Sequence, residues 1–411
     1  MPQALNDSHP DAPSRWGVVV LCMLFNVIDG LDAMAMAFTG SRVTAEWGLS
    51  AGQLGVLLSA SLVGMAGGSL IASRADLHGR RPLLLAGLLL SGVSMLLSFC
   101  SQGHSQLVLL RVFTGMGIGA VLVGANVLAY ESASPARRNL CIALQSFAFA
   151  LGGSLGGLLA HQFNEGMGWR YVFLAGGAVT LAGAVAGAIW LRESTSFVAL
   201  RQTQTGTWPE VFGRLFAGEQ RRLTASLALA LFLLMAGFYF VMSWTPTLLT
   251  QSGFSERQGA TGGLLLCLGG MLGALLVGAT ARRSGSRAML LGFLLLNALL
   301  LALMASMAAE AALAIAVGVV AGLALNGAIA ALYVLAPQTF PTDIRASGVG
   351  LVLAIGRLGA IIAPAAAGSL LVAQWSIREV FLLFACSQVL AALSVWLGYR
   401  RSAQGFGLSL K

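Results

Sequence analysis

Two aspartates and two arginines lie within apolar stretches of this chain, and these four residues are the most able to do chemistry. Asp29 and Asp32 occur in "NVIDGLDAMAM", Arg111 in "LRVFTGMGIGA", and Arg357 in "GRLGAIIAP". A charged side chain in hydrocarbon costs at least about 3 kcal/mol, so ionisable residues in such segments usually mark a functional site.

The two aspartates are spaced three residues apart, so they share one face of a helix. Counted from Trp16, Asp29 lies about 20 Å and Asp32 about 24 Å along that helix, in the outer half of a membrane. Adjacent carboxylates in a low dielectric resist ionising together, so the pair could take a proton on one side and release it on the other. The alternative is a purely structural pair held by hydrogen bonds between helices. The sequence leaves open which aspartate carries the proton, and Gly30 leaves room for a bend or a close neighbour.

The two arginines are predicted to face carboxylates. Arg111 lies about 6–8 Å below the outer surface, at a depth similar to that of Asp32, so an ion pair between them is expected. The alternative for Arg111 is a side chain that extends to the outer interface. Arg357 begins about 14 Å into its helix, where the planar guanidinium suits a carboxylate ligand. Both arginines are assigned to substrate binding.

Polar and aromatic side chains complete the predicted substrate contacts. The uncharged hydrogen-bonding groups are Asn326 and Gln145, and the aromatic candidates are Tyr239, Trp244 and Tyr333. Aromatic side chains could stack on a planar ring while an arginine holds its carboxylate. Each could instead pack in the core, and Trp244 could belong to an interfacial belt.

Composition indicates a membrane protein with many spans. Of the 411 residues 57% are hydrophobic and only 9% are charged, against about 25% charged in soluble proteins. Spans of about 20 apolar residues are predicted at 16–39, 51–73, 82–101, 107–129, 139–162, 169–191, 224–248, 259–280, 288–306, 311–336, 348–371 and 377–397. The fold class is therefore all-α and integral to the membrane, with twelve helices.

The net charge of +9 reflects the orientation of the chain in the membrane. Most of the 24 basic residues lie on the side shared by both termini, which places the termini in the cytoplasm. Nucleic acid is therefore not expected as a partner. The predicted domains are a cytoplasmic tail 1–15, a six-helix bundle 16–191, a cytoplasmic linker 192–223, a second six-helix bundle 224–397 and a cytoplasmic tail 398–411.

An internal repeat supports the two bundles. Adding 206 to a position carries Arg81 onto Arg287, Pro135 onto Pro341 and Trp169 onto Trp375. Two equal bundles that enclose a central site suit an alternating-access transporter.

The loop "ASRADLHGRRP" supplies charged groups that can bridge helix ends. Here the chain resembles the major facilitator superfamily, whose pattern at this loop is G-x-x-x-D-R-x-G-R-R. The residues that match the pattern, Asp76, Gly79, Arg80 and Arg81, are assigned to gating, while Ala72 and Leu77 depart from it. Glu131, at the inner end of the fourth span, is assigned to a cytoplasmic gate.

Longer motifs narrow the resemblance to the aromatic acid:proton symporter family. They are "DGLDAMAMAF", "LRVFTGMGIGA", "SWTPTLL", "FPTDIRASGVG" and "GRLGAIIAP". The resemblance implies import of a small aromatic carboxylate, of the benzoate or hydroxybenzoate type, together with protons. It also places an arginine at the position of Arg357.

Other functions find less support. The sequence lacks the grouping of a nucleophile and a base that an enzyme would need. It also lacks the repeated pore loop that a channel would need. The chain has no phosphate-binding loop for ATP and no spacing of its five cysteines that fits a metal or cofactor. A proton-antiport exporter of drugs or metabolites, or a symporter of a non-aromatic acid, stays open on the same fold. We expect a monomer in the bacterial inner membrane, with the lipid bilayer, protons and a small organic anion as its partners.

Overall fold

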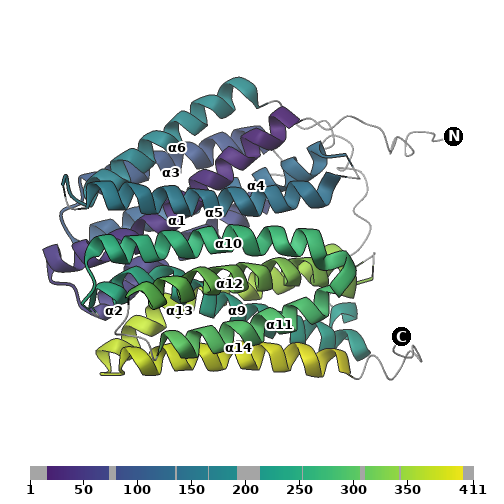
Figure 1. The fold of residues 1–411 in the computed structure, drawn as a ribbon. Helices are drawn as coiled ribbons and strands as arrows, with labels where there is room; N and C mark the ends of the chain where they lie inside the picture. Colours follow the sequence, from purple (N-terminus) through teal and green to yellow (C-terminus); the bar gives the residue numbers. More distant parts are fainter. Residues whose placement is uncertain are drawn as a thin grey trace.

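The computed structural model describes residues 16–73, 80–134, 137–164, 166–191, 213–251, 253–305, 311–341 and 344–400. This part of the chain is helical (Figure 1). The long helices are α1 (Trp16–Trp47), α2 (Ala51–Ser73), α3 (Arg80–Phe99), α4 (His104–Ser132), α5 (Arg138–Phe163), α6 (Arg170–Trp190), α9 (Gly218–Gln251), α10 (Glu256–Ser284), α11 (Ser286–Met304), α12 (Ala311–Thr339), α13 (Arg345–Val372) and α14 (Ile377–Arg400).

Eleven helices within the described ranges are long and apolar enough to cross a membrane, and α5 is not among them. α5 is interrupted by four glycines, Gln145 and His161, which lower its hydropathy. It packs against α1 and α10, and its Gln145 faces α1. The predicted spans therefore correspond to helices, and eleven of these helices have the length and hydropathy needed to cross a membrane.

Two helices extend farthest beyond their predicted spans. α1 continues to Trp47 and α9 begins at Gly218, whereas their spans were predicted at 16–39 and 224–248. The extra turns of α1 include the polar residues Arg42 and Glu46, because a helix can extend beyond the hydrocarbon into the aqueous interface. The described part of the predicted linker is thus partly helical.

The helices form two sets with the same packing pattern. In the first set the contacting pairs are α1–α5, α2–α4, α3–α4 and α3–α6, and in the second they are α9–α13, α10–α12, α11–α12 and α11–α14. The sets meet along α5–α10 and α2–α13, and also along α1–α9. Exchanging the two sets converts α5–α10 into α13–α2, so the arrangement has the pseudo-two-fold symmetry typical of a transporter built from repeats.

The first residue of α1 and the last residue of α14 lie at the same end of the molecule (Figure 1). We call this the terminal end and the opposite one the far end. Helices α1, α5, α9 and α13 run from the terminal end to the far end, and α2, α4, α10 and α12 run back.

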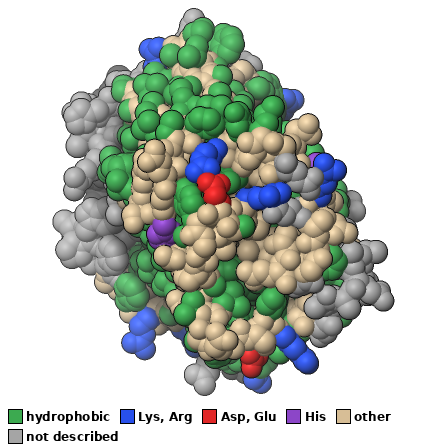
Figure 2. All heavy atoms as spheres, turned by 90° about the vertical axis from the view of Figure 1, so that its left-hand side faces the viewer, with side chains coloured by type: hydrophobic (Ala, Val, Ile, Leu, Met, Phe, Trp, Pro, Cys, Tyr) green, Lys and Arg blue, Asp and Glu red, His purple; other side chains and the backbone are tan. Residues whose placement is uncertain are grey.

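The two sets are in close contact in the half of the molecule nearer the far end. A Cβ at Gly55 of α2 would meet the backbone at Pro364 and Ala365 of α13, and Ser59 Oγ accepts a hydrogen bond from the amide of Ala365 at 3.1 Å. At α5–α10, a Cβ at Gly157 would meet Leu264. Seen from the far end, the surface is continuous, with scattered charged side chains (Figure 2).

Toward the terminal end, two glycines of the helices that meet have open space beside them. A Cβ at Gly67 of α2 or at Gly350 of α13 would have nothing within 4 Å. The side chain of Tyr333 on α12 is 41% exposed, although it interacts electrostatically with Arg357. The central region is therefore closed from the far end and more open from the terminal end.

Candidate functional site

Asp32 and Arg111 form a buried ion pair between α1 and α4. Arg111 Nη1 donates to Asp32 Oδ1 at 2.6 Å, and Nη2 donates to Oδ2 at 3.1 Å and to the Asp32 carbonyl at 3.1 Å. Both side chains are 1% exposed. The predicted ion pair is confirmed. The alternative in which Arg111 extends to the interface is wrong, because the carboxylate of Asp32 lies within reach inside the bundle.

Two neighbours hold this pair in place. Ser61 Oγ donates to Asp32 Oδ2 at 3.2 Å, and the Arg111 guanidinium lies 5.6 Å from the centroid of the Phe173 ring. Buried charges are stable only when they are paired and hydrogen-bonded. The carboxyl group of Asp32 thus has its partners already in place.

Asp29 has a different environment one turn earlier on α1. Its side chain is buried, and within the described part of the chain Oδ1 has no hydrogen-bond partner. The charged groups that act on it are Arg357 of α13 and Asp32. A buried carboxyl group with an oxygen that lacks a hydrogen bond is costly when ionised and tolerable when it holds a proton.

Arg357 connects Asp29 to two tyrosines. It is half-buried and interacts electrostatically with Asp29, Tyr239 of α9 and Tyr333 of α12. We call Arg357, Asp29, Tyr239 and Tyr333 the charged cluster. It combines α1 from one set with α9, α12 and α13 from the other. A conformational change that moves the two sets would alter the distance between Asp29 and Arg357.

Gly30 brings α5 close to the aspartates. A Cβ at this position would collide with the carbonyl of Phe149, so of the two roles suggested for Gly30 the structure shows the close neighbour. Asn26, one turn before Asp29, donates from Nδ2 to Gln145 Oε1 of α5 at 2.6 Å. Gln145 is buried, and its Nε2 has no partner among the described residues.

Asn26 is a site residue that sequence reasoning did not select. The available signal was an amide on an apolar helix, one turn from Asp29 and on the same face. Its partner Gln145 was selected as a substrate contact, and the structure places that amide against Asn26 of α1.

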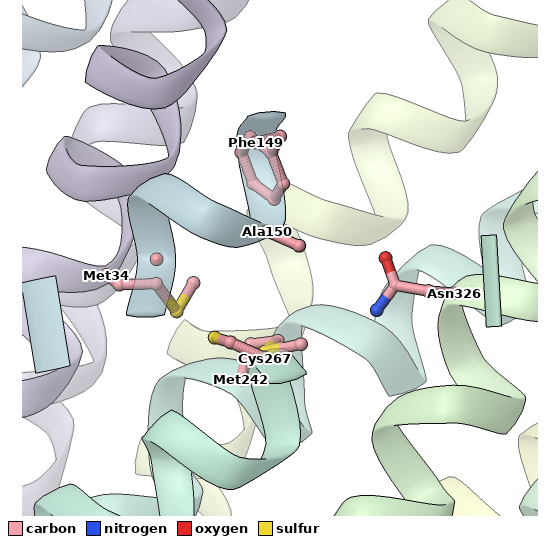
Figure 3. Close-up of a pocket in the computed structure, with 7 residues that line it drawn as sticks. Met34, Phe149, Ala150, Met242, Cys267 and Asn326 are labelled. Atoms are coloured by element: carbon pink, nitrogen blue, oxygen red, sulfur yellow. The ribbon is translucent and has the colours of Figure 1, made fainter. Parts of the chain in front are cut away.

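A small pocket lies where the two sets meet (Figure 3). Its lining residues come from α1, α5, α9, α10 and α12; they are Met34, Phe149, Ala150, Gly153, Met242, Cys267 and Asn326. The amide of Asn326 points toward this space from the side opposite Met34 and Cys267. The pocket is thus apolar, with one hydrogen-bonding group.

Trp244 does not line this pocket. Its side chain is fully buried, and Nε1 donates to the carbonyl of Pro364 at 3.0 Å. This contact joins α9 to α13. The interfacial belt suggested for Trp244 is therefore wrong, because the indole N–H is used inside the protein.

The predicted gating residues are only partly visible. Arg81 Nη2 donates to the carbonyl of Ala188, at the end of α6, at 2.8 Å. Asp76 and Gly79 lie outside the described residues, and the side chains of Arg80 and Glu131 lie outside them too.

The sequence and fold match a known family. A family model described as Major Facilitator Superfamily matches residues 21–309 and 261–407. The chain belongs to this superfamily. It is therefore a transporter and not an enzyme, and it is a multi-pass protein of the bacterial inner membrane.

Characterised relatives cover nearly the whole chain. The 4-hydroxybenzoate transporter PcaK of Pseudomonas aeruginosa is 31% identical, over 96% of this chain and 95% of the relative. The gallate transporter of Pseudomonas putida is 32% identical, over 95% of this chain and 93% of the relative. The crystal structure of a D-xylose–proton symporter has the same fold, with a TM-score of 0.79 at 17% identity, over 93% of this chain and 98% of that one.

Proposed function

We propose that this protein imports a small aromatic carboxylate together with a proton by alternating access. The observation that carries the proposal is the buried oxygen of Asp29 that has no hydrogen-bond partner among the described residues, on a side chain that Arg357 of the other helix set influences electrostatically. Two relatives are named as transporters of 4-hydroxybenzoate and of gallate. These names support an aromatic carboxylate as the substrate.

Arg357 is proposed to alternate between two carboxylates. When Asp29 is protonated, Arg357 is free to bind the carboxylate of the substrate as a planar donor fork. When the substrate leaves, Asp29 loses its proton and its carboxylate becomes the partner of Arg357. In either state the half-buried guanidinium has one negative partner, so substrate and proton travel together and the charge of Arg357 is not left uncompensated.

The other predicted contacts are divided by their surroundings. Tyr239 and Tyr333 share the cluster with Arg357, and Asn326 faces the pocket, so they are proposed to touch the substrate. Arg111, Gln145 and Trp244 are bonded to protein groups. We assign these three to positioning, in a revision of the substrate contacts predicted from the sequence.

Topology follows from the same proposal. α5 is taken as the twelfth span because it lies between α1 and α10, and the excess of basic residues places the terminal end in the cytoplasm. Residues 16–191 and 224–397 are then the two moving bundles of a monomer. In this orientation the structure corresponds to an inward-facing state, closed at the far end.

Uptake by the purified protein in proteoliposomes tests the function. Labelled benzoate, hydroxybenzoates, a non-aromatic carboxylate and a cationic drug are offered with and without an imposed pH gradient, acidic outside. We expect only the aromatic acids to accumulate, and only with the gradient. Accumulation of the drug with the opposite gradient, or of the non-aromatic acid alone, contradicts the proposal.

A further inference from the structure

We infer that the side-chain amide of Gln145 donates a hydrogen bond to the carboxylate of Asp29 once that carboxylate has lost its proton, and so sets how readily the proton is released. The inference rests on the proposed function, in which Asp29 carries the proton. It goes beyond it by assigning a positioning residue on α5, which acts on Asp29 and does not touch the substrate.

Two contacts between α1 and α5 bracket Asp29. Three residues before it, Asn26 donates to Gln145 at 2.6 Å, and one residue after it, a Cβ at Gly30 would collide with the carbonyl of Phe149. Both contacts join positions 119 residues apart, and the two helices run in the same direction. Gln145 therefore lies level with Asn26, about one turn or about 5 Å nearer the terminal end than Asp29. Helical side chains lean toward the N-terminus of their helix, so the carboxyl group of Asp29 extends back over that turn.

The hydrogen-bonding groups in this turn do not balance. Asn26 Nδ2 uses both of its hydrogens, on the Cys22 carbonyl at 3.0 Å and on Gln145 Oε1 at 2.6 Å. Among the described residues, Gln145 Nε2 is a buried donor without an acceptor, and Asp29 Oδ1 is a buried acceptor without a donor. Each unpaired group is costly. A bond between these two neighbours satisfies both.

The thiols near Gln145 do not replace Asp29 as its partner. Cys141 on α5 interacts with Gln145, and Cys22 on α1 interacts with Cys141. Cys141 Sγ donates to the carbonyl of Ala129 on α4 at 3.3 Å, and a thiol sulfur is a weak acceptor. An ionised carboxylate is a much stronger acceptor for an amide hydrogen.

The charged and titratable groups around Asp29 leave room for one more donor. Asp32 is already bonded to Arg111, and a carboxylate has two oxygens, so Arg357 can hold one oxygen of Asp29 while Gln145 holds the other. When Asp29 is protonated, the charge that both partners stabilise is gone. The bond from Gln145 therefore favours the ionised form alone. The groups that act on Asp29 are Asp32 of α1, Arg357 of α13 and Tyr239 of α9.

Binding of benzoate to the purified protein, measured as a function of pH, tests this inference. Protonated Asp29 leaves Arg357 to the ligand, so binding by the wild-type protein should fall as the pH rises and Asp29 ionises. Gln145→Met has a similar length and no donor, which makes the ionised form less favourable. The pH of half-maximal binding should therefore rise by about one unit.

Two further proteins separate proton release from structural damage. The matched control is Asn297→Leu, which removes a buried amide of α11 that also has no partner among the described residues; its midpoint should equal that of the wild type. Asp29→Asn should bind benzoate without this pH dependence, and adding Gln145→Met to it should change the affinity little. A loss of affinity in the double variant as large as that caused by Gln145→Met alone would show a structural effect and overturn the inference.

The remaining outcomes distinguish the inference from the proposed function. An unchanged midpoint in Gln145→Met overturns the inference and leaves the proposed function standing. A wild-type protein that binds neither benzoate nor 4-hydroxybenzoate, or binds them equally at every pH, overturns the proposed function and the inference with it. If Gln145→Met binds no benzoate, Gln145→Asn decides, because its amide is one methylene shorter: a raised midpoint supports the inference, and an unchanged one overturns it.

Discussion

At the scale of single residues, the two aspartates of α1 have opposite surroundings although they are three positions apart. Asp32 is bonded to Arg111 and Ser61, whereas Asp29 Oδ1 has no partner within the described residues. Sequence spacing predicted that they share a face, and it could not tell them apart. The difference arises from α2 and α4, which bring partners to Asp32 alone.

Substitution by asparagine should therefore separate the two roles. Asp29→Asn is expected to fold normally and to exchange labelled for unlabelled substrate across the membrane, because asparagine imitates the protonated acid. It should lose accumulation driven by a pH gradient, because it cannot release a proton. Uptake and exchange assays in proteoliposomes measure both properties.

Asp32→Asn should fail for a different reason. It leaves the guanidinium of Arg111 buried without a counter-charge, which costs about 3–5 kcal/mol of stability, so the thermal midpoint in detergent should fall. Removing both charges, with Asp32→Asn and Arg111→Leu together, should recover part of the loss. Two results together would reverse the assignment of proton coupling to Asp29. Asp29→Asn would accumulate substrate normally under the gradient, and Asp32→Asn would be stable but uncoupled.

At the scale of helices, the sequence predicted positions well and contacts less well. The apolar runs locate the spans because hydrocarbon thickness fixes their length. The Asp32–Arg111 pair was predictable because depth along two helices follows from residue number. The Asn26–Gln145 bond was not predicted, because it depends on which faces of α1 and α5 meet, and Gly-rich helices allow several packings.

The contact between α2 and α13 is proposed to act as the closure at the far end. Gly55 packs directly on the backbone of α13 at Pro364, so a larger side chain should keep the two helices apart. Gly55→Val should therefore favour the state that is open at the far end. Gly67→Val is the matched control on the same helix, since a Cβ there has nothing within 4 Å.

Thiol labelling measures this shift. In a protein without its five native cysteines, Phe38→Cys reports on closure, since Phe38 is 3% exposed and a Cβ at Gly157 of α5 or Gly263 of α10 would meet its ring. Labelling from outside by a membrane-impermeant maleimide should be faster with Gly55→Val and unchanged with Gly67→Val. Equal labelling in all three backgrounds would remove Gly55 from the closure.

At the scale of the whole molecule, the central site is open toward one end only. Contacts between the two sets gather in the half nearer the far end, while Tyr333, beside Arg357, is 41% exposed. An alternating-access protein in this state should offer its central site to the compartment at the terminal end. Because basic residues are concentrated there, we propose that this compartment is the cytoplasm.

Tyr333→Cys tests orientation and conformation together. In the same cysteine-free background, an impermeant maleimide should label it in inside-out vesicles and much more slowly in right-side-out vesicles. Arg378→Cys, exposed at the start of α14 near the far end, reports orientation alone and should be labelled only in right-side-out vesicles. If both positions react from the same side, the central site opens toward the far end and the inward-facing assignment is wrong. If they react from opposite sides as expected, substrate added from the inside should slow the labelling of Tyr333→Cys, because the carboxylate held by Arg357 would lie beside it.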